Sequence, residues 1–214
     1  MSTPDRLGGI ELRYVMTHLV SSELAEDPLN AAQRARFAAA CAHFPGVPTS
    51  LANSSGIFLG EDFRSDLARP GAALYGINPT PGQPNPMSRA VSLQARVLQV
   101  RELNAGETIG YNATFTAPSS MRVAVAGIGY ADGWHRSHSN RGAAYFDGLR
   151  LPLVGRVSMD LTTYDASAAP HLCEGEWIEL IGPHCLPDEA AAAAGTNGYE
   201  LLTSLALRCE RIYT

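Results

Sequence analysis

The pattern of apolar and polar residues differs between the two parts of this chain. In the first part, segments with a strand pattern alternate with segments with a helix pattern. The run LRYVMT at residues 12–17 is rich in β-branched and aromatic residues, which predicts a strand. Residues 29–44 place apolar side chains at helical spacing until Pro45, which predicts a helix. A further strand is predicted over residues 67–75. Alternating strands and helices indicate parallel strands joined by crossovers, so this region has an α/β pattern, as in part of a barrel.

A proline-rich segment ends this first pattern. Residues 80–88 read TPGQPNPMS, with three prolines in nine residues. Such a segment is typical of a linker between compact units. We therefore expect a first domain over residues 1–86 and a second over residues 87–214.

The second domain follows the two-residue period of β-strands. Strands are predicted in VSLQARVLQVREL, MRVAVAGIGY, GAAYFDGLRLPLVGRVSM and GEWIELIG, with turns at Asp147-Gly148 and Glu174-Gly175. Helices are predicted in PDEAAAAAG and near YELLTSL, and a last strand in RCERIYT. The predicted fold class is thus α/β plus all-β.

Composition and charge exclude several classes of function. The chain has 16 basic and 21 acidic residues, a net charge of −5, and no basic run that could follow a phosphate backbone. This argues against nucleic acid as a partner. The apolar runs are too short to cross a membrane, and the polar start MSTPDRLGG does not have the pattern of a signal peptide. We therefore expect a cytoplasmic protein.

Two counts bear on the chemistry. The four cysteines have neither a CxxC pair nor the dense spacing of a disulfide scaffold, so we expect reduced, buried packing residues. All 16 basic residues are arginines, and the chain contains no lysine. A mechanism that needs a lysine amine cannot be completed by these 214 residues alone.

Taken singly, the candidate site residues leave alternatives open. His18 follows a predicted strand and could be a ligand or acid, or an ordinary edge residue. His135 and His138 have the spacing of a metal pair, but no nearby carboxylate or cysteine completes a zinc site, so no metal is expected. In ANSSG, Asn53 and Ser54 could cap a short helix or hold a phosphate.

Six short sequences are more informative together. ANSSG, RPGAALYG, GETIGYNATFTA, GIGYADG, VGRVSMD and GYE lie along the chain and closely resemble the C-terminal half or more of bacterial alanine racemase, a pyridoxal 5'-phosphate enzyme. The resemblance runs from about Gly8 to the C-terminus. It implies the C-terminal part of a (β/α)8 barrel, then a mostly β domain, in a head-to-tail homodimer. It also implies interconversion of L-alanine and D-alanine, with D-alanine supplied for peptidoglycan.

The resemblance assigns the cofactor-binding roles residue by residue. Ser54, Gly71 and Tyr199 match positions that bind the phosphate of pyridoxal phosphate. Arg69 matches the arginine that faces the pyridine nitrogen, and His18 matches the histidine that supports this arrangement from beneath the ring. A guanidinium keeps its proton, so Arg69 would not protonate the ring nitrogen as an aspartic acid does, which weakens the electron sink.

The resemblance also assigns the residues that contact the substrate. Tyr111 matches the catalytic tyrosine, which the partner subunit offers. Met159 and Asp160 of the SMD sequence match the substrate-binding turn, where the backbone N–H of Met159 meets the carboxylate. Tyr130 matches a tyrosine at the entryway. Racemisation needs one acid/base group on each face of Cα, and in this family a lysine and this tyrosine provide them. A tyrosine acts as a base only where positive charge or hydrogen bonds favour the phenolate.

The chain departs from the family in two places. The lysine is missing, and we expect the early barrel units that carry it to be missing too; we do not assign the substrate-binding role of a family arginine to Arg6. Ser50 stands where many members have histidine, which we interpret as tolerated variation. We therefore expect that the chain does not racemise alone. A non-catalytic fragment that pairs with an intact racemase subunit, and a related amino acid racemase of the same fold, remain alternatives.

Overall fold

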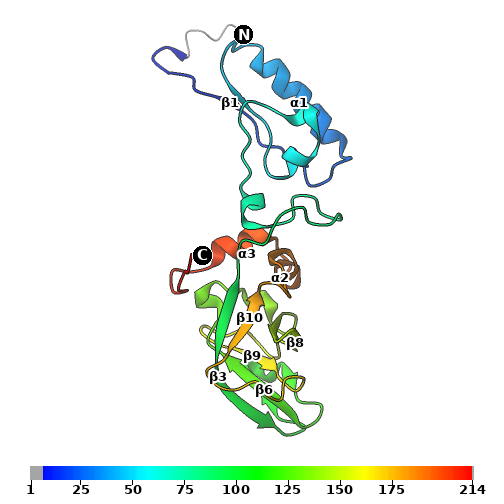
Figure 1. Cartoon of the computed structure of the whole chain (residues 1–214), viewed down its shortest axis with the longest axis vertical. Helices are drawn as coiled ribbons and strands as arrows, with labels where there is room; N and C mark the ends of the chain where they lie inside the picture. The colour runs from blue at the N-terminus through cyan, green and yellow to red at the C-terminus, as the bar shows by residue number, and fades with distance from the viewer. Residues whose placement is uncertain (1–6, 214) are drawn as a thin grey trace. The chain divides into compact units, whose positions relative to one another are not determined.

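The structure is a computed structural model that describes residues 7–213 and divides into two compact units, Met1–Ser88 and Arg89–Thr214 (Figure 1). The first unit contains β1 (Val15–Met16), α1 (Pro28–Cys41), β2 (Thr49–Ser50) and the 3-10 helices η2 (Ser55–Phe58), η3 (Glu61–Phe63) and η4 (Ala72–Tyr75). The second contains β3 (Leu93–Leu103), β4 (Thr108–Ile109), η5 (Tyr111–Ala113), β5 (Phe115–Thr116), β6 (Met121–Ala126), η6 (Tyr130–Asp132), η7 (Arg136–His138), β7 (Ala143–Phe146), β8 (Leu149–Pro152), β9 (Thr162–Asp165), β10 (Trp177–Ile181), α2 (Pro187–Ala194) and α3 (Gly198–Ser204).

The first unit has the predicted strand–helix–strand order. Strands β1 and β2 pair in parallel, with Val15 opposite Thr49, and α1 forms the connection between them. Helix α1 begins where Asp27 accepts a 2.9 Å hydrogen bond from the backbone N–H of Leu29, with proline at the first helical position. The α/β pattern predicted for this region is therefore confirmed.

The strand predicted over residues 67–75 is wrong. This segment forms one parallel bridge, between Asn53 and Arg69, and then enters the 3-10 helix η4. Pro70 has no backbone N–H and so cannot continue a ladder beyond that bridge. The bridge still places Arg69 beside the ends of β1 and β2, where a third parallel strand would have ended.

The second unit is built on a six-stranded antiparallel sheet in the order β8-β7-β10-β3-β6-β9. The turn between β7 and β8 is the predicted Asp147-Gly148, with φ of 49° and 77°. Two positive φ values are characteristic of the type I′ hairpin turn, which explains why this dipeptide was a reliable signal. The mainly β character of this region is confirmed.

Because of a bulge, β3 contributes side chains to two separate hydrophobic clusters. Its pairing with β6 shifts between Val97 and Gln99, which leaves Leu98 as the extra residue. Side chains change face at such a bulge. Val97 therefore packs in the main core, whereas Leu103 packs in a second cluster with Ile109 and Val123. Ile109 belongs to the short β4–β5 hairpin, so the second cluster fixes that hairpin to the sheet.

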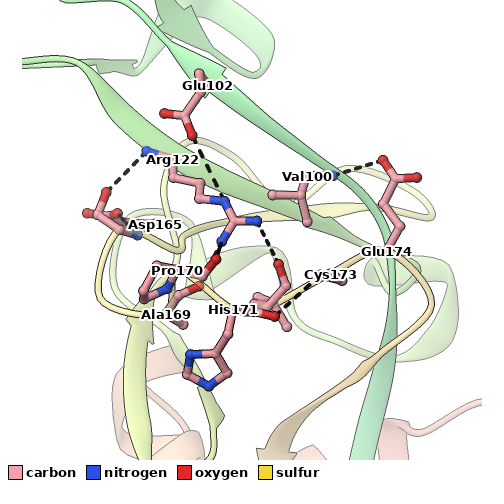
Figure 2. A network of polar contacts seen from close by, with 11 residues as sticks. Val100, Glu102, Arg122, Asp165, Ala169, Pro170, His171, Cys173 and Glu174 are labelled. Carbon is pink, nitrogen blue, oxygen red and sulfur yellow. Dashed lines mark hydrogen bonds and ion pairs between the residues drawn. The ribbon is translucent and has the colours of Figure 1, made fainter.

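A half-buried arginine shapes one of the long connections around this sheet. Arg122 on β6 donates hydrogen bonds to the carbonyl oxygens of Ala169, Pro170 and Leu172, at 2.9, 2.5 and 2.8 Å (Figure 2). Its side chain is 22% exposed, and Glu102 lies 4.0 Å away as a weak counter-charge. The guanidinium thus satisfies the carbonyls of a loop that has no strand partner of its own.

The two predicted helices are confirmed, but the predicted last strand is wrong. Helix α2 has Asp188 and Glu189 in its first turn and ends at Gly195 with φ of 72°, and α3 follows it. Residues 208–213 contain no strand. The backbone N–H of Ala206 instead donates to the carbonyl oxygen of Asp132 at 2.9 Å, which draws the segment after α3 away from the sheet edges.

The prediction for the cysteines is wrong in part. All four are free thiols, as expected, and Cys185 is buried. Cys41 and Cys209 are only half-buried and Cys173 is exposed. Among the described residues, none of the helices combines the length and apolar character needed to cross a lipid bilayer.

The stability of the second unit should depend on pH through His138. Its ring is fully buried, stacks on Trp134 with centroids 3.9 Å apart, and burial lowers its pKa from 6.5 to about 4, helped by His135. His138 is then neutral in the folded chain but takes a proton below pH 6.5 when unfolded. The free energy of unfolding should fall by up to about 3 kcal/mol as pH drops from 6.5 to 4. Urea unfolding followed by tryptophan fluorescence measures this. His138→Phe should remove the dependence, whereas the exposed His171→Gln should keep it; equal behaviour of the two variants would contradict the assignment.

Gly133 should be intolerant of any side chain. Its φ is 92°, and a Cβ built there lies 2.0 Å from the carbonyl oxygen of Ser204 at the end of α3. Gly195 has a similar φ of 72° but no atom within 4 Å of a built Cβ. Gly195→Ala should cost about 1 kcal/mol for the backbone conformation alone. Gly133→Ala should cost at least about 3 kcal/mol, because backbone must also move. Equal losses in thermal unfolding would show that α3 does not pack against Gly133.

Candidate functional site

Arg69 lies at the carboxyl ends of the parallel strands, held by uncharged groups. Its backbone N–H donates to the carbonyl oxygen of Ala52 at 2.9 Å. One terminal nitrogen donates to the carbonyl oxygen of Thr17 at 2.5 Å, and the other to the hydroxyl of Ser50. No carboxylate within the described range pairs with this guanidinium. Its positive charge is therefore available to a ligand.

Ser50 has a defined role in holding this arginine. It is 1% exposed and donates its hydroxyl proton to the carbonyl oxygen of Leu67 at 2.8 Å. The oxygen lone pairs then face Arg69. A serine can thus hold the guanidinium at a position where the sequence comparison expected histidine.

Ser54 and Gly71 lie beside Arg69, with a geometry suited to an anion. The hydroxyl oxygen of Ser54 accepts a 3.1 Å hydrogen bond from the backbone N–H of Ala73, so its own proton remains free to donate. A Cβ built on Gly71 would meet no atom within 4 Å, so the backbone there faces open space. The N-cap position of η2 is Ser54, which makes no side-chain capping hydrogen bond, whereas the side chain of Asn53 accepts from the backbone N–H of Gly56 at 2.9 Å. Asn53 thus stabilises the start of this helix, and the phosphate-binding role of Ser54 stays a prediction.

His18 lies two residues after the end of β1 and is exposed. Its carbonyl oxygen accepts from the side chain of Gln33 at 2.7 Å, which fixes its backbone next to Thr17. In the first unit the structure thus brings together His18, Ser54, Arg69 and Gly71 at one edge.

Tyr111 is presented at the tip of the β4–β5 hairpin, with 68% of its surface exposed. The loop departs from ordinary backbone: Asn112 and Ala113 have φ of 62° and 47°. Asn140 supports it by donating to the hydroxyl of Thr114 at 3.4 Å. A left-handed alanine is costly and persists only where the surroundings impose it, so the contacts around this loop hold it in that conformation. The tyrosine is not a core aromatic.

Met159 and Asp160 occupy the centre of a tight turn. Ser158 and Leu161 close it through a 3.0 Å backbone hydrogen bond. In the described part of the chain the backbone N–H of Met159 has no protein acceptor, which leaves it free for a carboxylate. The carboxylate of Asp160 is not free, because it accepts from Arg208 at 2.7 Å.

Tyr130 lies against the same turn. Its backbone N–H donates to the carbonyl oxygen of Ser158 at 3.0 Å, and that of Ala131 donates to Met159 at 2.9 Å. A Cβ on Gly129 would lie 2.3 Å from the carbonyl oxygen of Met159, so only glycine permits this approach. The structure therefore brings Tyr130, Met159 and Asp160 together.

Tyr199 lies in the first turn of α3 and is 37% exposed. Asn197 caps this helix by accepting from the backbone N–H of Glu200 at 3.0 Å. At the other end, the ring nitrogen Nε2 of His135 and the hydroxyl of Ser204 are 2.8 Å apart. His135 thus contacts the C-terminal end of α3. Over residues 7–213, no group of three or more histidine, cysteine, aspartate or glutamate side chains is placed to hold a metal ion.

Sequence reasoning missed Asp132 and Arg208. These residues form an ion pair, with Nε of Arg208 3.3 Å from Oδ1 of Asp132, although they are far apart in sequence. No spacing rule would have found this pair. The only sequence signal was the acidic residue inside GIGYADG.

Comparison with known proteins agrees with these features. Two family models match: "Alanine racemase, N-terminal domain" over residues 2–79 and "Alanine racemase, C-terminal domain" over residues 90–213. The alanine racemase of Acidiphilium cryptum is 55% identical over 209 residues, which are 98% of this chain and 58% of that protein. The protein named "Alanine racemase, catabolic" of Mesorhizobium japonicum is 51% identical over 207 residues, 96% of this chain and 54% of that protein.

A solved structure extends the similarity to the fold. The crystal structure of alanine racemase from Bartonella henselae with covalently bound pyridoxal phosphate has a TM-score of 0.92 and 42% identity, over 99% of this chain and 59% of that chain. The present chain thus spans about three fifths of the proteins it matches. On the match of its larger domain alone, the chain belongs to the alanine racemase family.

Proposed function

We propose that this chain is the C-terminal portion of a pyridoxal phosphate-dependent alanine racemase that interconverts L-alanine and D-alanine. The observation that carries the proposal is the presentation of Tyr111, 68% exposed on a loop with two left-handed non-glycine residues. In this proposal the enzyme works in the cytoplasm and supplies D-alanine for peptidoglycan. The name of the Mesorhizobium relative points to a catabolic role as the alternative.

The residues of the first unit fit the cofactor. Ser54, with its free hydroxyl proton, and Gly71, with open space before it, suit a phosphate. Tyr199 is assigned to the phosphate by the family resemblance alone. Arg69 would face the pyridine nitrogen with its charge uncompensated by any carboxylate, and His18 would support the ring from beneath. When bound, pyridoxal phosphate supplies an electron sink that makes the Cα proton of the amino acid acidic. The Bartonella henselae structure, with covalently bound pyridoxal phosphate, supports this assignment.

The residues of the second unit would orient the substrate and move the proton. The free N–H of Met159 would hold the carboxylate of alanine, with Asp160 in the same turn and Tyr130 beside it at the entry. Tyr111 would remove or return the Cα proton on one face. Positioned proton transfer of this kind is worth about 10²- to 10⁴-fold in rate.

Racemisation also needs an acid/base group on the other face of Cα, and this missing group is the reason for proposing a partner. Because none of the 214 residues is lysine, the amine has to come from outside them. In a homodimer with a shared site, Tyr111 would act on a site completed by another subunit. Two alternatives remain within this proposal: a non-catalytic fragment that pairs with an intact racemase subunit, and a racemase of the same fold for a different amino acid.

The chain alone should not attach the cofactor covalently. After incubation with pyridoxal phosphate and reduction with borohydride, mass spectrometry should find no adduct on a side chain, because no ε-amino group is present. The Acidiphilium cryptum enzyme, treated in parallel, serves as the positive control. Peptide mapping separates any modification of the chain's α-amino group. A side-chain adduct would overturn the argument from the missing lysine.

Tyr111 should restore activity to a racemase that lacks its own tyrosine. The Acidiphilium cryptum enzyme is prepared with phenylalanine at the position that aligns with Tyr111, and the chain is added in excess. Mixed dimers should regain activity by about 10²- to 10⁴-fold over the disabled enzyme, measured as loss of optical rotation or with a D-amino acid oxidase assay.

Two variants of the chain make this experiment decisive. Tyr111→Phe should restore nothing, whereas Tyr213→Phe, at a tyrosine that is 89% exposed, should restore as much as the parent chain. Restoration by Tyr111→Phe would remove the proton-transfer role. Absence of a mixed dimer in size-exclusion chromatography would remove the pairing hypothesis. A panel of other amino acids in the same assay tests the substrate.

A further inference from the structure

We propose that Arg208 is a positioning residue that holds together three segments of the substrate site through Asp132 and Asp160. The inference rests on the proposed function in one respect, since it takes Tyr130, Met159 and Tyr199 as site residues. Everything else in it concerns contacts within the second unit.

Arg208 joins two carboxylates from different segments. Its Nε lies 3.3 Å from Oδ1 of Asp132, and its Nη2 lies 2.7 Å from Oδ1 of Asp160. The hydrogen bond to Asp160, and after it the charge of Asp132, raise the pKa of Arg208, so the bridge stays charged at any physiological pH. One guanidinium therefore links the turn at 158–161 to the segment that precedes Trp134.

Asp132 extends this link to α3. Its side chain is only 12% exposed, and its Oδ2 accepts from the backbone N–H of Gly129 at 2.8 Å. Its carbonyl oxygen accepts from the backbone N–H of Ala206 at 2.9 Å, directly after α3. Asp132 thus connects the backbone of Gly129, the backbone of Ala206 and the side chain of Arg208.

The bridge has a stability effect too small to be its main consequence. Arg208 and Asp160 are 54% and 52% exposed, and exposed ion pairs contribute about 0–1 kcal/mol. The contacts instead determine where backbone groups point. The turn that carries the N–H of Met159 is held from Tyr130 and Ala131 on one side and from Arg208 on the other.

The bridge also controls charge at the substrate carboxylate. Asp160 follows directly after the N–H proposed to bind that carboxylate. Without Arg208 its negative charge would be uncompensated and would repel an anionic group at Met159. Arg208 neutralises it. Loss of Arg208 should therefore weaken substrate binding more than it slows proton transfer.

Hydrogen–deuterium exchange on the 214-residue chain tests the framework without any activity. In Arg208→Ala, amides over residues 129–133, 157–161 and 203–207 should exchange about tenfold faster, while those of β3 stay unchanged. Arg208→Lys should give an intermediate result, because it keeps the charge but cannot reach both carboxylates in one plane. Arg136→Ala, at an exposed arginine with no acidic partner among residues 7–213, is the matched control. Unchanged exchange in Arg208→Ala, or equal acceleration throughout the sheet, would overturn the proposal.

Kinetics of the mixed dimer test the effect of charge. In the dimer of this chain with the Acidiphilium cryptum enzyme that lacks its own tyrosine, all activity comes from sites completed by Tyr111 of this chain. Arg208→Ala should raise KM for alanine about tenfold with kcat within about threefold. Adding Asp160→Asn to Arg208→Ala should bring KM back toward the parent value, which a purely structural role would not do. No recovery, or a loss confined to kcat, would overturn the charge role. If no mixed dimer racemises alanine, the proposed function fails, and the exchange experiment still decides the inference.

Discussion

The one-residue bulge in β3 is the constraint from which the presentation of Tyr111 follows. A regular strand would show one face to the main core and the other to solvent along its whole length. The extra residue Leu98 reverses the faces, so Leu103 reaches the far side and packs there with Ile109. The β4–β5 hairpin gains a hydrophobic base on that side. Its tip can then depart from ordinary backbone geometry, because the base and Asn140 hold it in place.

The turn at residues 158–161 is supported in a different way. The side chains of Met159 and Leu161 are exposed, and the turn is fixed by hydrogen bonds and by the charge of Arg208. Gly129 and Gly133 allow backbone to approach backbone, and Asp132 between them bonds to each neighbouring segment. A hydrophobic contact tolerates small shifts, whereas hydrogen bonds fix direction. The backbone N–H of Met159 is therefore held in a fixed direction.

The sequence predicted those parts of the fold that depend on local chemistry. Asp147-Gly148 gave the hairpin turn because its two φ values require such residues, and the acidic start and glycine end of α2 marked that helix. The strand assigned to residues 67–75 failed because one bridge at Arg69 is all that Pro70 permits. The resemblance of short motifs to the alanine racemase family identified Tyr111 as a candidate site residue. No sequence pattern predicted the left-handed backbone at Asn112.

Contacts between distant residues account for the rest of what the sequence could not show. The role of Ser50 depends on a guanidinium 19 residues away, and that of Asp160 on one 48 residues away. Neither spacing has a periodic signature. Ser50 was interpreted as tolerated variation because only its identity was visible, not its two hydrogen bonds. Asp160 was expected to contact the substrate because the family resemblance assigns that role to its neighbour Met159, although the carboxylate of Asp160 is already paired with Arg208.

Arg69 and Arg208 show how the same side chain serves two purposes according to its partners. Arg69 is held by a hydroxyl and a carbonyl oxygen, dipoles that fix its direction without cancelling its charge. Arg208 contacts two carboxylates, so its charge is used within the protein and the cluster is left with a net negative charge. The first arrangement leaves a positive field for a ligand, and the second weakens, without cancelling, a negative field that would oppose an anionic one. Because a guanidinium keeps its proton in both settings, the difference lies entirely in the neighbours that the fold supplies.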